Sequence, residues 1–80
     1  MHSLILYSRP GCHLCELLLD ELRPMLGPSD EVRIVDISEN ADLTRRYGLR
    51  IPVLHTGTQE LSAWPFDRAR VASYLKSRNS

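Results

Sequence analysis

The stretch LYSRPGCHLCE, residues 6–16, places two cysteines three residues apart just after an apolar run. Cys12 and Cys15 are the only cysteines in the 80-residue chain. Upstream, residues 3–7 (SLILY) predict a short apolar β-strand, and downstream leucines recur at helical intervals, which predicts an α-helix that Pro24 ends or kinks. The cysteine pair therefore lies where a strand gives way to a helix.

The rest of the chain continues to alternate between strand-like and helix-like segments. Alternating apolar residues predict a strand over 31–37, and the stretch 38–48 predicts a short helix. Its candidate capping residues are Ser38 and Asn40 at the N-terminus and Gly48 at the C′ position. The first two strands are joined through a helix, so we expect them to be parallel.

The C-terminal third predicts a β-hairpin followed by a helix. Residues 51–55 (IPVLH) and 59–63 (QELSA) are the two strands, and Asp67 is a candidate N-cap of the last helix. The resulting order is β-α-β-α-β-β-α, an α/β sheet with helices on both faces. We interpret residues 1–80 as a single domain, because 80 residues leave no room for a second core.

Composition excludes several classes of function. The chain is 42% apolar and 25% charged, as in globular domains, and its ten basic and ten acidic residues sum to zero net charge. This balance provides no electrostatic basis for nucleic acid or a membrane surface as a partner. No apolar segment approaches the ~20 residues that span a bilayer, and the N-terminus lacks the features of a signal peptide. We expect a cytoplasmic monomer.

The cysteine pair has three interpretations: a redox pair, metal ligands or small core residues. Unpaired N–H groups and the helix dipole at a helix start stabilise a thiolate, and they lower thiol pKa values below the free value of about 8.5. Cys12 would then be the exposed nucleophile, and Cys15, one turn further in, the buried resolving thiol. A zinc site needs four suitably spaced ligands, and one C-x-x-C pair with scattered histidines such as His13 and His55 falls short of that spacing. The setting favours the redox interpretation.

The motif resembles that of a known family. LYSRPGCHLC resembles the Y-[ST]-[KR]-P-x-C-x-x-C signature of glutaredoxins, and YGLRIPVL, residues 47–54, resembles the segment around their cis-proline. The predicted order of elements matches over the whole chain. The resemblance implies the thioredoxin fold of glutaredoxin type, with a four-stranded mixed sheet flanked by three helices. More narrowly, the chain is similar to compact bacterial glutaredoxin-like proteins.

The resemblance also implies an activity and its residues. The protein would be a thiol–disulfide oxidoreductase in electron transport and cell redox homeostasis, with no bound cofactor or metal. Cys12 and Cys15 would alternate between a disulfide and a dithiol. Pro52 would be the cis-proline, Ile51 would offer its backbone to substrate, and Arg9 matches the basic residue that holds a glutathione carboxylate. His13 either supports the thiolate or is a solvated side chain.

Departures from the family pattern concern the choice of partner. Where glutaredoxins have a Gly-Gly pair followed by an acidic residue, this chain has Ser62-Ala63, and Asp67 comes late. Trp64 either lines a substrate groove beside Cys12 or fills the junction between hairpin and helix. Substrates would be protein or small-molecule disulfides, and the reductant either glutathione or thioredoxin reductase. A metal or iron–sulfur carrier and a redox-inert binding module are the rival interpretations.

Overall fold

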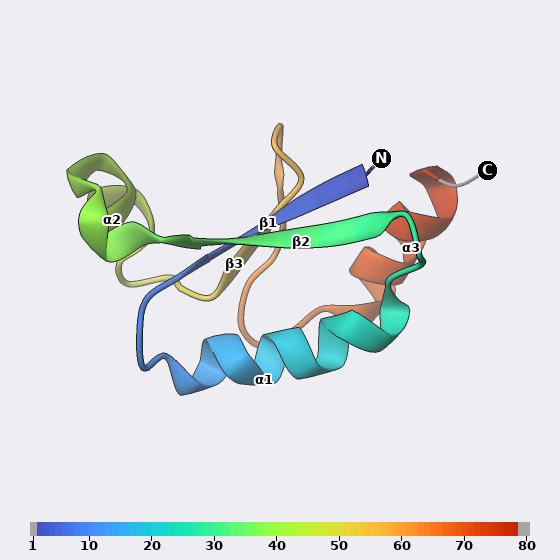
Figure 1. Cartoon of the computed structure of the whole chain (residues 1–80), viewed down its shortest axis with the longest axis horizontal. Helices are drawn as coiled ribbons and strands as arrows, with labels where there is room; N and C mark the ends of the chain where they lie inside the picture. Colours follow the sequence, from blue (N-terminus) through green and yellow to red (C-terminus); the bar gives the residue numbers. More distant parts are fainter. Residues whose placement is uncertain (1, 79–80) are drawn as a thin grey trace.

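The computed structural model describes residues 2–78 and consists of four strands and three α-helices in that range (Figure 1). Their order confirms the prediction of β-α-β-α-β-β-α. The strands are β1 (His2–Ser8), β2 (Asp30–Asp36), β3 (Val53–His55) and β4 (Glu60–Ser62). The α-helices are α1 (His13–Leu22), α2 (Ala41–Tyr47) and α3 (Arg68–Arg78), and short 3-10 turns span Arg23–Met25 and Ile37–Glu39.

The four strands form one mixed sheet in the order β2-β1-β3-β4. β1 and β2 are parallel, as expected for two strands joined through a helix, whereas β3 is antiparallel to both β1 and β4. Tyr7 near the end of β1 pairs with Val53 at the start of β3. The chain leaving β1 toward Cys12 and the chain entering β3 through Pro52 therefore lie at the same end of the sheet.

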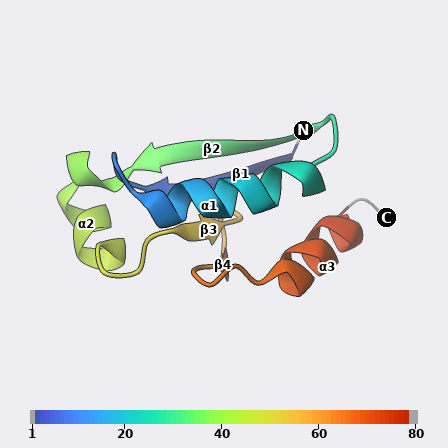
Figure 2. The same cartoon turned by 90° about the horizontal axis from the view of Figure 1, so that it is seen from below.

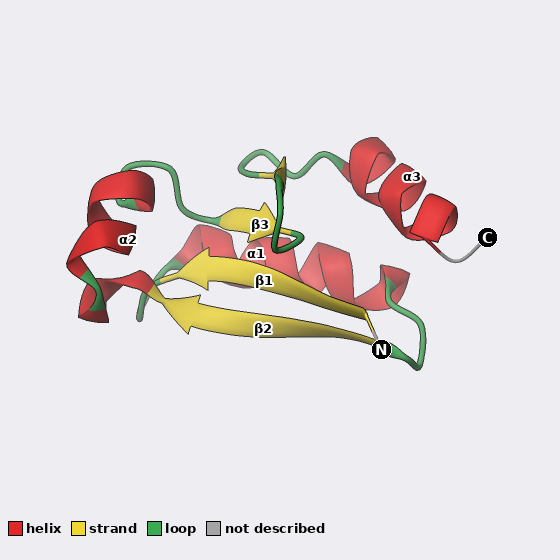
Figure 3. Cartoon of the chain, turned by 90° about the horizontal axis from the view of Figure 1, so that it is seen from above, coloured by secondary structure: helices red, strands yellow, loops and turns green. Residues whose placement is uncertain are grey.

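Helices cover the two faces of the sheet unequally. α1 and α3 pack on one face (Figure 2), where the main core contains Leu4 and Leu6 of β1 together with Leu18 and Leu22 of α1. α2 lies at the end of the sheet where β1 and β2 terminate (Figure 3). It closes a smaller cluster on the opposite face, formed by Ile37, Tyr47 and Val53. Alternation along the strands explains this division, since neighbouring residues point to opposite faces.

Local sequence signals account for most helix ends. α1 ends at Leu22, and Pro24 lies in the 3-10 turn that follows. Proline has no N–H to donate to a carbonyl one turn earlier, so the α-helix does not continue through it. Asn40 caps α2 by accepting a hydrogen bond from the Leu43 N–H (3.0 Å). Asp67 likewise accepts from the Arg70 N–H (3.0 Å), which confirms it as the cap of α3.

Two predictions at the ends of α2 were wrong. Ser38 is not an N-cap, because its N–H and hydroxyl donate to Asp36, which caps the 3-10 turn instead. Gly48 is not a left-handed C′ residue, since its φ of −55° is right-handed helical. Glycine is needed there for space, because a Cβ atom would collide with the Thr44 carbonyl oxygen.

None of the helices within residues 2–78 combines the length and apolar character needed to cross a bilayer.

Candidate functional site

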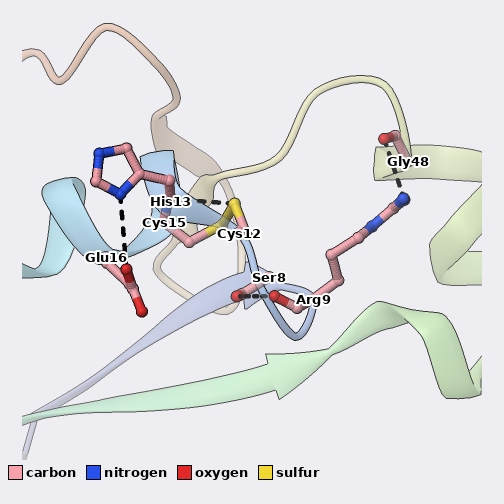
Figure 4. The surroundings of a disulfide bond; sticks show 7 residues. All are labelled: Ser8, Arg9, Cys12, His13, Cys15, Glu16 and Gly48. Carbon is pink, nitrogen blue, oxygen red and sulfur yellow. Dashed lines mark hydrogen bonds and ion pairs between the residues drawn. A yellow bond between two sulfur atoms is a disulfide. The ribbon is translucent and has the colours of Figure 1, made fainter.

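The two cysteines form a disulfide at the start of α1 (Figure 4). Their Cα atoms are 5.3 Å apart, in the range usual for disulfides. Cys12 is the N-cap residue of α1 and is partly exposed, whereas Cys15 lies within the first turn and is only 3% exposed. The two sulfurs therefore differ in access to a partner, as the sequence predicts.

The first turn of α1 directs a backbone donor at Cys12. The Cys15 N–H donates to the Cys12 Sγ (3.2 Å), and the Cys12 N–H in turn donates to the Arg9 carbonyl (3.2 Å). A negative charge on the Cys12 sulfur would meet this donor and the positive end of the α1 dipole. The residues that flank Cys12 in sequence are exposed: Arg9, Pro10, Gly11, His13 and Leu14.

Arg9 lies between the cysteine loop and α2. Its Nη2 donates to the Gly48 carbonyl (3.2 Å) at the C-terminal end of α2, where helix carbonyls carry partial negative charge (Figure 4). Its positive charge also helps to lower the pKa of Asp36 at the end of β2. Arg9 thus connects three segments around the site, and part of its hydrogen-bonding capacity is engaged within the chain.

Asp36 is a site neighbour that the sequence did not single out. Hydrogen bonds from the Ser38 hydroxyl (2.6 Å) and N–H (2.9 Å) hold the pKa of its carboxyl below the ordinary value, and the charge of Arg9 contributes further. The charged form of Asp36 therefore organises the connection between β2 and α2. The stabilisation is present above the ordinary pKa of 3.8 and is lost as pH falls through the lowered value.

Asp36→Ala should consequently destabilise the protein at pH 7, and the difference from wild type should shrink as pH drops below 3.8. The reason is that wild-type Asp36 becomes protonated and loses its charge-assisted hydrogen bonds. Urea unfolding of both proteins at pH 7 and in acid measures this difference. Glu39→Ala, which removes a nearby exposed carboxylate, is the matched control. A difference that does not change with pH would contradict the assigned role.

His13 points away from the sulfur atoms. Its Nδ1 lies 3.7 Å from Glu16 Oε2, one turn along α1, and its side chain is 78% exposed (Figure 4). Of the two interpretations offered by the sequence, this arrangement fits the solvated side chain in the disulfide form.

Ile51 and Pro52 form the second half of the site. The peptide bond between them is cis, as the resemblance implied, and Pro52 is fully buried. The Ile51 N–H donates to the Tyr47 carbonyl (3.0 Å). The N–H that the resemblance offers to substrate is therefore engaged within the chain, whereas a role of the Ile51 carbonyl stays a prediction.

The region that departs from the family pattern is internally hydrogen-bonded. Ser62 is buried, and its hydroxyl accepts from the Asp67 N–H (3.0 Å). Trp64 packs against the main core between the sheet, α1 and α3, which matches the interpretation that it fills the junction between hairpin and helix. A role of Trp64 in a substrate groove stays a prediction.

No group of three or more His, Cys, Asp or Glu side chains able to hold a metal ion is found among the described residues. The Nδ1 of His55 accepts a hydrogen bond from the Gly57 N–H (2.9 Å), and its ring contacts Tyr7 edge-on.

The sequence argument did not single out Asp36 or Leu49, and it assigned Gly48 to a left-handed turn without anticipating its contact with Arg9. Asp36 and Gly48 act through contacts with residues that are distant in sequence, or through close backbone approach, so no local pattern indicates these contacts. Leu49 did carry a signal, because it is an apolar residue between Gly48 and Arg50, beyond the end of the predicted helix.

A sheet of this order, with a disulfide-forming C-x-x-C pair at the start of the first helix and a cis-proline before β3, defines a small protein of the thioredoxin fold. The family model described as Glutaredoxin-like domain (DUF836) matches residues 3–76. The chain belongs to this family. Among curated proteins, no significant match to the sequence is found.

Solved structures share this fold. Protein Ne2328 from Nitrosomonas europaea is 36% identical, with a TM-score of 0.80 and coverage of 91% of this chain and 89% of that one. Target protein XcR50 from X. campestris is 37% identical, with a TM-score of 0.71 and coverage of 92% and 96%. A malarial protein, 17% identical with a TM-score of 0.55 and coverage of 94% and 93%, shares the fold alone.

Proposed function

We propose that the protein is a cytoplasmic, monomeric thiol–disulfide oxidoreductase that works without a bound cofactor. The membership of a glutaredoxin-like family and the Cys12–Cys15 pair fit a redox role. One observation carries the proposal further: the partly exposed Cys12 sulfur accepts the N–H of the nearly buried Cys15 at the start of α1. This arrangement supports an accessible thiolate and a protected second thiol, which are the two groups that disulfide exchange requires.

The reaction proceeds in two exchanges. The Cys12 thiolate attacks one sulfur of a substrate disulfide, so that a mixed disulfide forms and the other substrate sulfur leaves as a thiolate that takes up a proton. Cys15, after losing its proton, attacks the Cys12 sulfur and releases the second substrate thiol. The substrate gains two electrons, and the protein is left with the Cys12–Cys15 disulfide. An external dithiol or two thiols return it to the reduced form.

The surroundings of α3 favour thioredoxin reductase over glutathione as the source of electrons. Binding of a glutathione carboxylate calls for free backbone donors, such as those at a helix N-terminus. Here the Asp67 N–H donates to Ser62 and the Arg70 N–H donates to the Asp67 side chain. Pro65 has no N–H to offer. These donors of the α3 N-terminus are therefore already engaged.

Reduction of bis(2-hydroxyethyl) disulfide, monitored through the consumption of NADPH, tests both the oxidoreductase activity and the choice of reductant. One assay regenerates the protein with thioredoxin reductase, and the other with glutathione and glutathione reductase. We expect turnover in the first assay to exceed turnover in the second. Faster turnover with glutathione would reverse the assignment of reductant, whereas no turnover in either assay, with both cysteines reduced at the start, would overturn the oxidoreductase proposal.

A further inference from the structure

Tyr7 and Tyr47 stack on each other and connect β1 to α2. Their ring centroids lie 4.4 Å apart, with an angle of 16° between the ring planes. Tyr7 lies near the end of β1, and Tyr47, which is 5% exposed, is the last residue of α2. Stacked aromatic pairs contribute stability beyond the area that they bury. The proposed exchange reactions make no use of this contact, so its place in the fold needs a separate explanation.

The backbone of Tyr47 holds the segment that leads into β3. Its carbonyl accepts the N–H groups of Arg50 and Ile51 (2.8 and 3.0 Å). At the other end of this segment, Val53 pairs with Tyr7 in the sheet and packs in the same apolar cluster as Tyr47. Tyr7 therefore contacts the groups that hold the segment on both sides of Ile51.

Tyr7 is also close along the chain to the cysteine loop, residues 9–12. The Arg9 carbonyl accepts the Cys12 N–H, and the Arg9 side chain donates to the Gly48 carbonyl, each at 3.2 Å (Figure 4). α2 lies at the end of the sheet (Figure 3) and takes no part in the hydrogen bonds between strands. Its placement relative to the cysteine loop therefore depends on side-chain contacts such as the tyrosine stack and the Arg9 hydrogen bond.

We propose that Tyr7 is a positioning residue for disulfide exchange. Stacked on Tyr47, it holds the segment around Ile51 in place beside the bound substrate. This inference rests on the proposed function and adds a residue to its site. Without the stack, the segment would occupy its present place for only a fraction of the time, and substrate binding would weaken by that fraction. The Cys12 sulfur would keep its donor, because the Cys15 N–H belongs to the first turn of α1.

Backbone amide hydrogen exchange of Tyr7→Leu, followed by NMR on the reduced protein, tests the placement of the segment without reference to activity. This variant removes the stack and retains an apolar side chain, whereas Tyr7→Phe keeps the ring. We expect the Arg50 and Ile51 amides to exchange about threefold to tenfold faster in Tyr7→Leu, as loss of an aromatic pair predicts. The Glu16 amide, which donates to the Cys12 carbonyl, should keep its wild-type rate, and Tyr7→Phe should match wild type throughout.

Two reactions of Cys12, measured with Cys15→Ser present in each variant, test the effect on exchange. The first is mixed-disulfide formation with the disulfide of N-acetylcysteinamide, whose amide groups can pair with the Ile51 carbonyl. The second is alkylation by iodoacetamide, which reports the thiolate alone. We expect Tyr7→Leu to slow the first reaction about threefold to tenfold and to leave the second unchanged.

Ile5→Ala is the matched control, because Ile5 is a half-buried residue on the same face of β1 and lies outside the cluster around Tyr47. It should leave the amide exchange of the segment and both reactions unchanged. Thermal unfolding checks that all variants fold. If Tyr7→Leu does not fold, Tyr7→Met carries the same comparison.

Each way of failing gives a different result. Unchanged exchange of the Arg50 and Ile51 amides would overturn the positioning role, as would equal effects in Ile5→Ala or in Tyr7→Phe. Faster amide exchange with an unchanged rate of mixed-disulfide formation would overturn the link to the reaction, while the oxidoreductase proposal would stand. Absence of exchange with any disulfide in the wild-type protein would refute the proposed function itself.

Discussion

Cys12→Ser should reduce disulfide exchange to the rate of the buffer alone, whereas Cys15→Ser should leave the first exchange intact and stop the second. A serine hydroxyl is not ionised near neutral pH, so Cys12→Ser removes the nucleophile that meets the substrate. Cys15→Ser retains that nucleophile but lacks the thiol that releases the product. The Cys15→Ser variant should therefore accumulate as a covalent mixed disulfide with its substrate.

Mass spectrometry of the two variants after incubation with bis(2-hydroxyethyl) disulfide measures this outcome. The Cys15→Ser protein should gain one mercaptoethanol adduct that dithiothreitol removes, and the Cys12→Ser protein should gain little. The double variant is the control for adducts formed elsewhere. Preferential trapping by Cys12→Ser would mean that the roles of the two sulfurs are exchanged. Such a result would also be at odds with the 3% exposure of Cys15.

Leu18→Ala should lower the free energy of unfolding by about 2–5 kcal/mol, the usual cost of emptying a buried leucine site. Leu18 is fully buried in the core that attaches α1 to the sheet. Total stabilities of small domains are only about 5–15 kcal/mol, so this single change removes a large fraction. Urea unfolding of the reduced protein measures the effect without the contribution of the disulfide.

Leu14→Ala provides the matched control for this measurement. It makes the same chemical change in the same helix, but Leu14 is 40% exposed. The intrinsic helix propensities of the two variants change alike, so the difference between them reports burial. We expect Leu14→Ala to change stability by about 0.5 kcal/mol or less. Equal losses for the two variants would show that packing of α1 contributes less than its buried leucines indicate.

The sequence predicted those parts of the fold that depend on local chemistry. Pro24 marked the end of α1, and Asn40 and Asp67 marked the starts of α2 and α3. The order of elements along the chain followed from its apolar periodicity, and the parallel pairing of β1 with β2 followed from their connection through a helix. Such signals lie within a few residues of the feature they specify, which is why a single sequence suffices to find them.

The parts that escaped prediction depend on contacts across the fold. Arg9 reaches a carbonyl 39 residues away, and no pattern near either residue indicates this contact. The Gly48 prediction failed because glycine serves equally in a left-handed turn and where a neighbouring carbonyl leaves no room for a Cβ atom. Asp36 was assigned to a strand as a polar residue, and its capping of the next turn requires the backbone path beyond β2.

The pairing of Tyr7 with Val53 has a consequence for how the site comes into being. A one-residue slip of β1 would turn Leu4 and Leu6 out of the main core, so the apolar residues enforce the register of the sheet. The same register brings the cysteine loop beside the cis-proline segment. The apolar core and the redox site are therefore specified by one alignment, and a chain that has folded correctly needs no separate step to assemble its chemistry.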